Sequence, residues 1–365
     1  MANRHFNQPS RLLSVLVIVL FKGVESYRGG INKDISVYEY IALNIHDPKP
    51  SRPVENCCWR SPENLGEISG VAVNPDGYPV IFHRGDRTWS YDTFNEAAEY
   101  QEEYKGPIQI NTVLTLDFKT GDIISGWGNH TFYLPHGIHI DKQRNIWLTD
   151  VALHQVFKFS PSGGDRLMTL GQKFEPGNDL EHFCQPTAVA VLPNNEIVIA
   201  DGYCNHRILM FDKEGNPKYS INEEWIPLNV PHALTVLPNR QVCVADREHW
   251  RIVCLPWEYK TNTEASQDPA VPYLISNEAF GRIFGIASYH GTIYAVNGAT
   301  LNSDGSKIQV RGFIVDPLHR NITGVWGPET SSFENPHAIA ACPYGSAIYV
   351  SEIGPNKIWK FDLRE

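Results

Sequence analysis

Leu134-Pro135-His136-Gly137-Ile138-His139-Ile140 contains a Pro-His step that returns twice, at Pro231-His232 and Pro336-His337. Each copy is followed by the same pattern: a strand, a turn, a second strand that ends in an acidic residue, a loop and a third strand. The three acids are Asp150, Asp246 and Glu352. A strand pattern that recurs in one frame along a chain indicates an internal repeat.

Three further copies keep this frame without the histidine. The six copies begin at residues 68, 135, 186, 231, 283 and 336, which gives steps of 67, 51, 45, 52 and 53 residues. Units of roughly 40 to 50 residues that contain about four strands are typical of propeller blades. The sequence therefore predicts an all-β fold, a six-bladed β-propeller, in which residues 66–365 form the ring.

The histidines fall on every second unit of this predicted ring. The first strand of each blade lines the central channel, so His136, His232 and His337 are expected to converge on the axis. Three imidazoles that meet in this way form a metal site with an open position, as in catalytic zinc centres. The alternative for each histidine alone is that it simply begins a strand.

Composition limits the kinds of protein to which the chain can belong. Of 365 residues, 42% are hydrophobic and 20% are charged, and 28 Gly with 25 Pro suit many short strands joined by turns. The net charge is −10 and no basic run is present, so nucleic acid is not an expected partner.

The N-terminal residues resemble a secretory leader. Residues 1–26 combine early basic residues with the apolar run Leu12–Phe21, which is too short to span a bilayer and predicts a signal peptide; an uncleaved anchor is the alternative. Residues 27–65 are Pro-rich and are expected to be an irregular segment that leads into the ring. Asn129 and Asn321 begin glycosylation sequons. We therefore expect a protein that is secreted or lies in the lumen of the secretory pathway, with no stable membrane span.

Seven cysteines fit that oxidising compartment, although an odd number cannot all pair within the chain. Cys243 and Cys254 are placed on neighbouring strands of one unit. Cys184 precedes the third unit and Cys204 lies in its loop, where a bridge would hold Tyr203. The pairing is not fixed by the sequence, and three cysteines remain unassigned: Cys57, Cys58 and Cys342. Two polar stretches, Asn95–Lys105 and Thr261–Pro272, predict surface loops.

Loops after the second strands carry further candidates for chemistry. Arg84, Tyr203 and Arg247 follow the second strands of units one, three and four, so they are expected at one mouth of the channel. A tyrosine acts as a base when cations stabilise its phenolate, and arginines bind carboxylates. The alternative is a packed aromatic residue with two arginines that pair with nearby acids. The set favours acid–base chemistry on a small anion that bears a hydroxyl group.

Six segments of the chain resemble peptidyl-α-hydroxyglycine α-amidating lyases, whose propeller is built from NHL repeats. The resemblance runs in order from about residue 60 to the C-terminus. It implies a carbon–nitrogen lyase that cleaves peptidyl-α-hydroxyglycine into an amidated peptide and glyoxylate. The segments are His83-Arg84-Gly85-Asp86, Tyr133-Leu134-Pro135-His136-Gly137, residues 149–158, His182-Phe183-Cys184-Gln185-Pro186-Thr187, Asp201-Gly202-Tyr203-Cys204-Asn205 and Cys243-Val244-Ala245-Asp246-Arg247-Glu248.

The resemblance also implies roles for individual residues. Tyr203 would be the base, Arg84 would assist it and bind substrate, and Arg247 matches another arginine of the channel. The zinc ligands and the two disulfides that the resemblance implies are His136, His232 and His337, with Cys184–Cys204 and Cys243–Cys254.

Two departures from the family pattern concern a second metal and a second enzyme. A calcium ion would be held by the backbone carbonyls of Val71 and Ile138, but the aspartate expected after the third histidine is Ala338 here, which places calcium in doubt. The copper monooxygenase domain often fused to this lyase is not expected in the chain, so a separate peptidylglycine monooxygenase would supply the substrate.

Two other functions compete with the lyase. One is a non-catalytic NHL-type propeller that serves as a secreted protein-binding module, which would not need the histidines, Tyr203 and Arg84 together. The other is a metal-dependent propeller hydrolase, which usually holds calcium through acidic and amide ligands rather than imidazoles.

Overall fold

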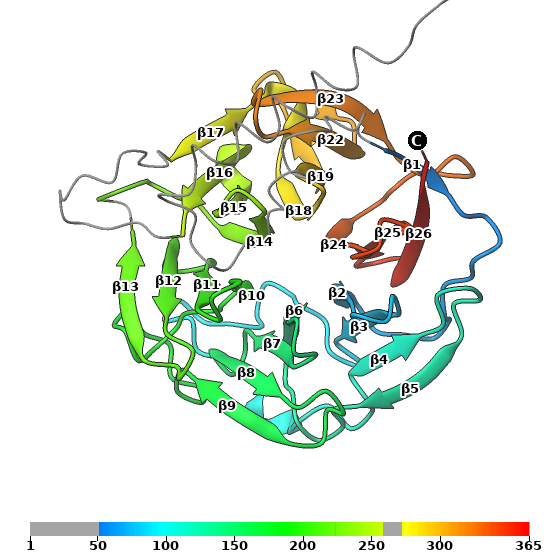
Figure 1. The fold of residues 1–365 in the computed structure, drawn as a ribbon. Coiled ribbons are helices and arrows are strands. Elements are labelled where there is room, and N and C mark those ends of the chain that lie inside the picture. Colours follow the sequence, from blue (N-terminus) through cyan, green and yellow to red (C-terminus); the bar gives the residue numbers. More distant parts are fainter. Residues whose placement is uncertain (1–50, 223, 258–271, 365) are drawn as a thin grey trace, which may run out of the picture. The chain divides into compact units, whose positions relative to one another are not determined.

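Six four-stranded antiparallel sheets surround a central channel in the computed structural model (Figure 1). The structure describes residues 51–222, 224–257 and 272–364. The predicted six-bladed β-propeller is confirmed. The 1–26 signal peptide and most of the 27–65 segment lie outside the described residues.

Each blade has an inner strand at the channel, two middle strands and an outer strand. The first three blades contain β2 (Ile68–Val73), β3 (Pro79–His83), β4 (Val113–Leu116) and β5 (Ile123–Trp127); β6 (Pro135–Ile140), β7 (Ile146–Asp150), β8 (Gln155–Phe159) and β9 (Arg166–Leu170); and β10 (Ala188–Val191), β11 (Ile197–Asp201), β12 (Arg207–Phe211) and β13 (Pro217–Ile221).

The last three blades follow the same order. They contain β14 (Pro231–Leu237), β15 (Gln241–Asp246), β16 (Arg251–Pro256) and β17 (Tyr273–Ser276); β18 (Ile283–Tyr289), β19 (Thr292–Asn297), β22 (Gly312–Asp316) and β23 (Asn321–Trp326); and β24 (Pro336–Ala341), β25 (Ala347–Glu352), β26 (Lys357–Arg364) and β1 (Arg52–Glu55). A small hairpin of β20 (Thr300–Leu301) and β21 (Lys307–Ile308) extends the fifth blade.

The second strand of a blade is packed between its neighbours on both faces. Every residue of β7, β11, β15 and β25 is buried, and an apolar run of this length without alternation is the pattern of a fully buried strand. The outer strand β5 is exposed along most of its length. The hydrophobic core therefore forms a series of layers between adjacent blades.

The repeated acid at the end of the second strand ties the chain that enters the second, third, fourth and sixth blades. Asp150 accepts hydrogen bonds from the backbone N–H groups of Tyr133 at 2.7 Å and Leu134 at 3.0 Å. Glu352 does the same for Glu334 and Asn335. Burial raises the pKa of the Asp150 carboxyl, and these bonds oppose that rise. This contact accounts for the acid that the sequence repeats.

The ring is closed by a strand that the sequence analysis did not predict. Arg52–Glu55, inside the segment expected to be irregular, form β1 and pair antiparallel with β26, with Arg52 opposite Arg364. The sixth blade is thus built from both ends of the described chain, and the propeller begins near residue 52 rather than 66.

The predicted surface loop Asn95–Lys105 belongs to a longer insertion between β3 and β4, residues 84–112. Asn95 and Glu96 are exposed as expected, and the short helix η1 (Glu103–Lys105) has no buried residue. Phe94 and Tyr100 instead pack into the core of the first two blades. The insertion is therefore anchored at its base, and the loop predicted at Thr261–Pro272 lies outside the described residues except for Pro272.

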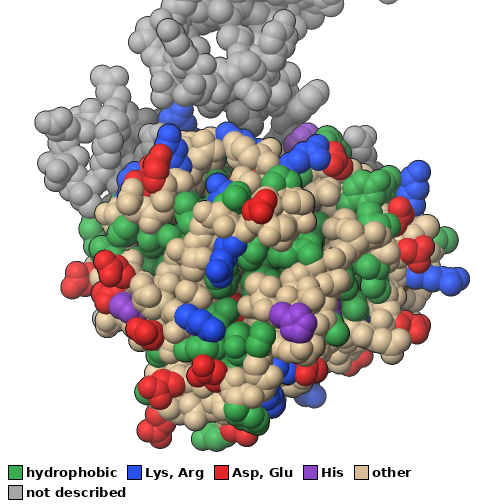
Figure 2. All heavy atoms as spheres, turned by 90° about the horizontal axis from the view of Figure 1, so that it is seen from below, with side chains coloured by type: hydrophobic (Ala, Val, Ile, Leu, Met, Phe, Trp, Pro, Cys, Tyr) green, Lys and Arg blue, Asp and Glu red, His purple; other side chains and the backbone are tan. Residues whose placement is uncertain are grey.

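Both implied disulfides are present, Cys184–Cys204 and Cys243–Cys254, whereas Cys57 and Cys58 are exposed and Cys342 is buried as free cysteines. Within the described ranges, no helix is long and apolar enough to cross a membrane. Figure 2 shows one side of the ring, where basic and acidic side chains are interspersed without a continuous basic patch.

Candidate active site in the channel

A β-bulge directs each of the three histidines toward the axis. Pro231 pairs with Asp246 and Ala233 with Ala245, so His232 is the extra residue between them. His337 is skipped in the same way, and the register of β6 also shifts at His136. A bulge leaves one residue unpaired and re-aims its side chain. The Pro-His step in the sequence therefore marks the bulge.

The three imidazoles meet in the channel as predicted. Their ring centroids are 4.8 to 5.0 Å apart, and all three side chains are buried. One ligand nitrogen from each lies within 4.8 Å of the other two, so His136, His232 and His337 form a group that can hold one metal ion.

Each histidine is oriented by a carbonyl group of the next blade. The Nδ1 atoms of His136, His232 and His337 lie 2.7, 2.6 and 2.7 Å from backbone oxygens of blades three, five and one, which belong to Thr187, Phe284 and Ser69. A carbonyl oxygen only accepts, so Nδ1 carries the hydrogen and Nε2 keeps its lone pair. This arrangement is typical of metal-binding histidines.

Burial keeps these imidazoles neutral, which is the form that binds metal. It lowers the pKa of His136 and His232 well below the usual value and that of His337 to about 3, and nearby guanidinium charges add to the effect. Three neutral nitrogen donors fit zinc, which accepts imidazole ligands and an open fourth position.

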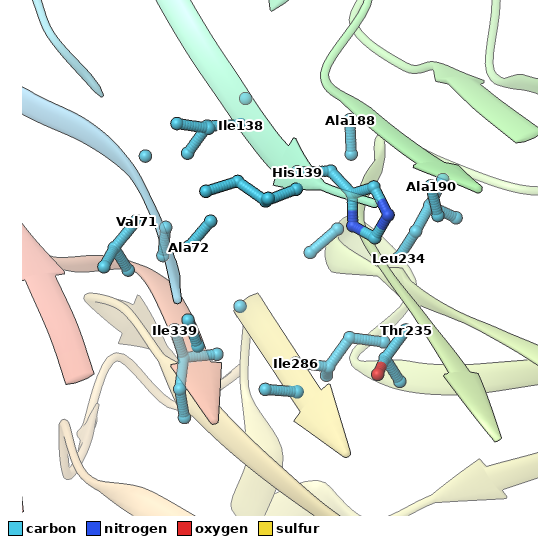
Figure 3. A pocket seen from close by; sticks show the side chains of 18 of the residues that line it. Val71, Ala72, Ile138, His139, Ala188, Ala190, Leu234, Thr235, Ile286 and Ile339 are labelled. Carbon is cyan, nitrogen blue, oxygen red and sulfur yellow. The ribbon is translucent and has the colours of Figure 1, made fainter. Parts of the chain in front are cut away.

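The channel does not fit a calcium ion equally well. A cavity of about 510 Å³ extends from the histidines along the inner strands, and the aliphatic side chains of Val71, Ile138, Ile286 and Ile339 line it (Figure 3). Among the described lining residues the one carboxylate is Asp141, and both its oxygens accept hydrogen bonds from the side chains or backbone of Asn145 and Trp147. Calcium prefers six to eight oxygen ligands, and the described lining side chains provide no free carboxylate for it, so the backbone carbonyls of Val71 and Ile138 would have to hold it without one.

Tyr203 approaches the histidines from the loop after β11. Its Oη lies 3.0 Å from Nε2 of His136 and 3.2 Å from Nε2 of His232, and the Cys184–Cys204 disulfide adjoins it. Burial raises the pKa of Tyr203 above its usual value, while the charges of Arg247 and Arg84 lower it in part. The two arginines alone therefore do not make the phenolate available.

Arg84 and Arg247 both lie close enough to Tyr203 for their charges to lower its pKa. The Arg84 guanidinium is buried, with Nε 3.0 Å from the carbonyl oxygen of Pro135 and Nη1 2.5 Å from Glu67. The guanidinium carbon of Arg247 lies 5.3 Å from the ring centre of Tyr203 and 4.9 Å from that of Phe284. Both cations thus share the mouth with the phenol.

Two aromatic residues of the mouth were not identified from the sequence. Trp89, from the insertion, contacts Tyr203 with ring centres 4.7 Å apart and lies 5.4 Å from the Arg84 guanidinium. Phe284 occupies the bulge of the fifth blade, between Ile283 and Gly285. The repeat alignment contains a signal for Phe284, because it stands where units two, four and six have histidine. No signal in the repeat marks Trp89.

Comparison with known proteins defines the class and then the family. The NHL repeat model matches residues 183–211 and 228–255, so the chain is a propeller of NHL repeats with a buried histidine cluster in its channel. It is 44% identical to peptidyl-α-hydroxyglycine α-amidating lyase 2 of Drosophila melanogaster over 88% of this chain and 78% of that protein. A probable amidating lyase of Caenorhabditis elegans is 35% identical, over 82% of this chain and 84% of that one. The chain belongs to the family of peptidyl-α-hydroxyglycine α-amidating lyases.

More distant similarities agree with this fold. The peptidyl-glycine α-amidating monooxygenase B of Xenopus laevis is 40% identical over 81% of this chain, which corresponds to 34% of that longer protein. Among solved structures, a streptogramin B lyase has a TM-score of 0.51 at 12% identity and covers 86% of this chain and 97% of its own, a likeness that concerns the fold alone.

Proposed function

We propose that this protein cleaves the bond between the amide nitrogen and Cα of peptidyl-α-hydroxyglycine, which yields a C-terminally amidated peptide and glyoxylate. The observation that carries the proposal is the meeting of one phenol with two of three neutral imidazoles at 3.0 and 3.2 Å. A module that only binds proteins has no need for this buried arrangement. A hydrolase that relies on calcium usually holds it through acidic and amide side chains, and the one carboxylate among the described lining residues, Asp141, is already hydrogen-bonded.

The reaction requires that a hydroxyl proton leaves while the C–N bond breaks. In our proposal Tyr203 accepts that proton, the hydroxyl oxygen becomes the aldehyde oxygen of glyoxylate, and the amide nitrogen departs with the bonding electrons and takes up a proton. The histidines and Arg84 are buried and Tyr203 and Arg247 are half-buried, so the phenol and the guanidinium groups act in a medium less polar than water. Arg84 and Arg247 provide positive charge at the mouth, where the anionic substrate binds.

Zinc is the metal that we assign to His136, His232 and His337. When bound, it would supply a Lewis acid that lowers the pKa of the substrate hydroxyl. The protein's own part is to keep all three imidazoles neutral, buried and oriented by carbonyl groups.

We also infer a place in the secretory pathway. Two disulfides support an oxidising compartment, and both Asn129 and Asn321 are exposed, so each sequon is accessible to glycosylation. The substrate must come from an enzyme that hydroxylates the Cα of a C-terminal glycine. A separate peptidylglycine monooxygenase is that class of enzyme.

The test is to incubate zinc-loaded protein with a synthetic peptide that ends in α-hydroxyglycine and to measure amidated peptide and glyoxylate. Equal amounts of both products are expected, with one zinc per chain. His232→Ala should lose zinc and activity together, whereas His290→Ala, at an exposed histidine, should change neither. If the wild type forms no product at full zinc occupancy, the binding-module function is favoured instead.

A further inference from the structure

The two arginines at the mouth of the channel are each paired with a glutamate of their own. Glu67 precedes β2 and accepts a hydrogen bond from Nη1 of Arg84 at 2.5 Å. Glu248 follows Arg247 in the short helix η2 (Arg247–His249) and accepts from its Nε at 2.9 Å. Glu67 and Glu248 are only 16% and 21% exposed. Hydrogen bonds between charged groups of low exposure fix geometry more firmly than surface ion pairs do.

The two pairs leave different parts of the guanidinium groups available. Arg84 uses Nε for the carbonyl of Pro135 and Nη1 for Glu67, so Nη2 alone is outside these contacts. Arg247 uses Nε for Glu248, and its side chain also donates a hydrogen bond to the Tyr203 hydroxyl, so only the remaining Nη hydrogens are outside these contacts. A carboxylate binds an arginine best through two parallel N–H groups. Arg247 still keeps hydrogens on both Nη atoms and therefore matches a carboxylate, whereas Arg84, with Nη2 alone outside its contacts, matches a single acceptor oxygen.

A third arginine completes the arrangement around Glu248. Arg282, which directly precedes β18, donates from Nε to the other carboxylate oxygen of Glu248 at 2.8 Å. Glu248 thus connects the fourth blade to the fifth, and Arg247 cannot turn about its side chain without breaking that connection. The group of three arginines and two glutamates carries one excess positive charge, which one substrate carboxylate would balance.

We propose that Glu67 and Glu248 are positioning residues, which divide the work between the two arginines: Arg247 holds the substrate carboxylate through its paired Nη atoms, and Arg84 makes one hydrogen bond near Tyr203. This inference rests on the proposed function for the identity of the substrate. It names Glu248, with Arg282 behind it, as the residue that determines recognition of the free carboxylate.

The experiment compares two peptides that both end in α-hydroxyglycine, one with a free carboxylate and one with a terminal carboxamide. Glu248→Ala should lower kcat/KM for the carboxylate peptide by about 10- to 100-fold, mainly by raising KM. It should change kcat/KM for the carboxamide peptide by less than about 3-fold. Glu67→Ala should instead lower kcat for both peptides to a similar extent. Glu63→Ala is the matched control, since this exposed glutamate lies four residues before Glu67.

Melting curves and zinc content of each variant separate positioning from loss of folding. Arg282→Ala removes the second partner of Glu248 and leaves Glu248 itself in place. It should lower kcat/KM for the carboxylate peptide by less than Glu248→Ala does. The inference is overturned if Glu248→Ala affects both peptides equally, or neither, in protein that is folded and holds zinc.

Binding of N-benzoylglycine and of its amide, measured by calorimetry, tests carboxylate binding by Arg247 without turnover. Glu248→Ala should weaken binding of the acid and leave the amide unchanged. This result would support the carboxylate site even if the wild type formed no product, so failure of the proposed function and failure of this inference are distinguishable.

Discussion

Zinc binding by the histidine cluster should be almost independent of pH between 7.5 and 5.5. Three ordinary histidines, with a pKa of about 6.5, are each about 90% neutral at pH 7.5 and about 9% neutral at pH 5.5. Because all three must be neutral, such a site loses about 1,000-fold in affinity over this range. Burial lowers the pKa of His337 to about 3 and those of His136 and His232 well below 6.5. We therefore expect the zinc affinity of the folded protein to change by less than about 3-fold between pH 7.5 and 5.5.

Acid should release the metal through unfolding instead. Since the pKa values are lower in the folded state, the unfolded chain takes up protons first as the pH falls below about 6.5. Above about pH 6.5 these histidines do not lower the free energy of unfolding. As the pH falls from 6.5 toward their folded-state pKa values, each histidine lowers the free energy of unfolding by up to about 1.4 kcal/mol per pH unit. Zinc loss and loss of β structure should therefore coincide.

The assay is competition between the protein and a fluorescent zinc chelator at pH 7.5, 6.5 and 5.5, corrected for protonation of the chelator and combined with circular dichroism. A short peptide with three histidines is the reference, because its zinc affinity should fall ~1,000-fold between pH 7.5 and 5.5. A fall of that size in protein that is still folded would refute the reasoning, because it would mean that the imidazoles are hydrated rather than buried.

Three further predictions follow from the site. Tyr203→Phe should lower kcat by about 10²-fold or more while zinc is retained, as turnover and metal analysis would show; a wild-type rate would mean that another group takes the proton. Ala338→Asp should create a melting temperature that rises with the logarithm of calcium concentration, whereas a strong shift of the unmodified protein at micromolar calcium would show that another residue replaces the missing ligand. Gly137→Ala would place a Cβ 2.5 Å from the carbonyl oxygen that orients His136, so weaker zinc binding and a lower melting temperature are expected. Gly164→Ala, where the nearest atom is 3.7 Å away, is its control, and equal behaviour of the two would count against the second-blade geometry.

The sequence by itself determined the number of blades, the place of each inner strand and the meeting of the three histidines. These follow from a repeat, because residues at the same position of alternate blades must converge on the axis of a closed ring. The acid at the end of the second strand was visible for the same reason. The two confirmed disulfides came from the family resemblance.

Only the tertiary structure decided what surrounds those residues. The carbonyl groups that orient the imidazoles, the closure of the ring by β1 and β26, and the packing of Trp89 on Tyr203 are contacts between parts of the chain that no local pattern connects. His337, for example, bonds to Ser69 across 268 positions of sequence. The same holds for Glu248, whose partner Arg282 belongs to the next blade. A repeat fixes where equivalent positions lie, whereas the contact between non-equivalent side chains of neighbouring blades depends on how those blades pack.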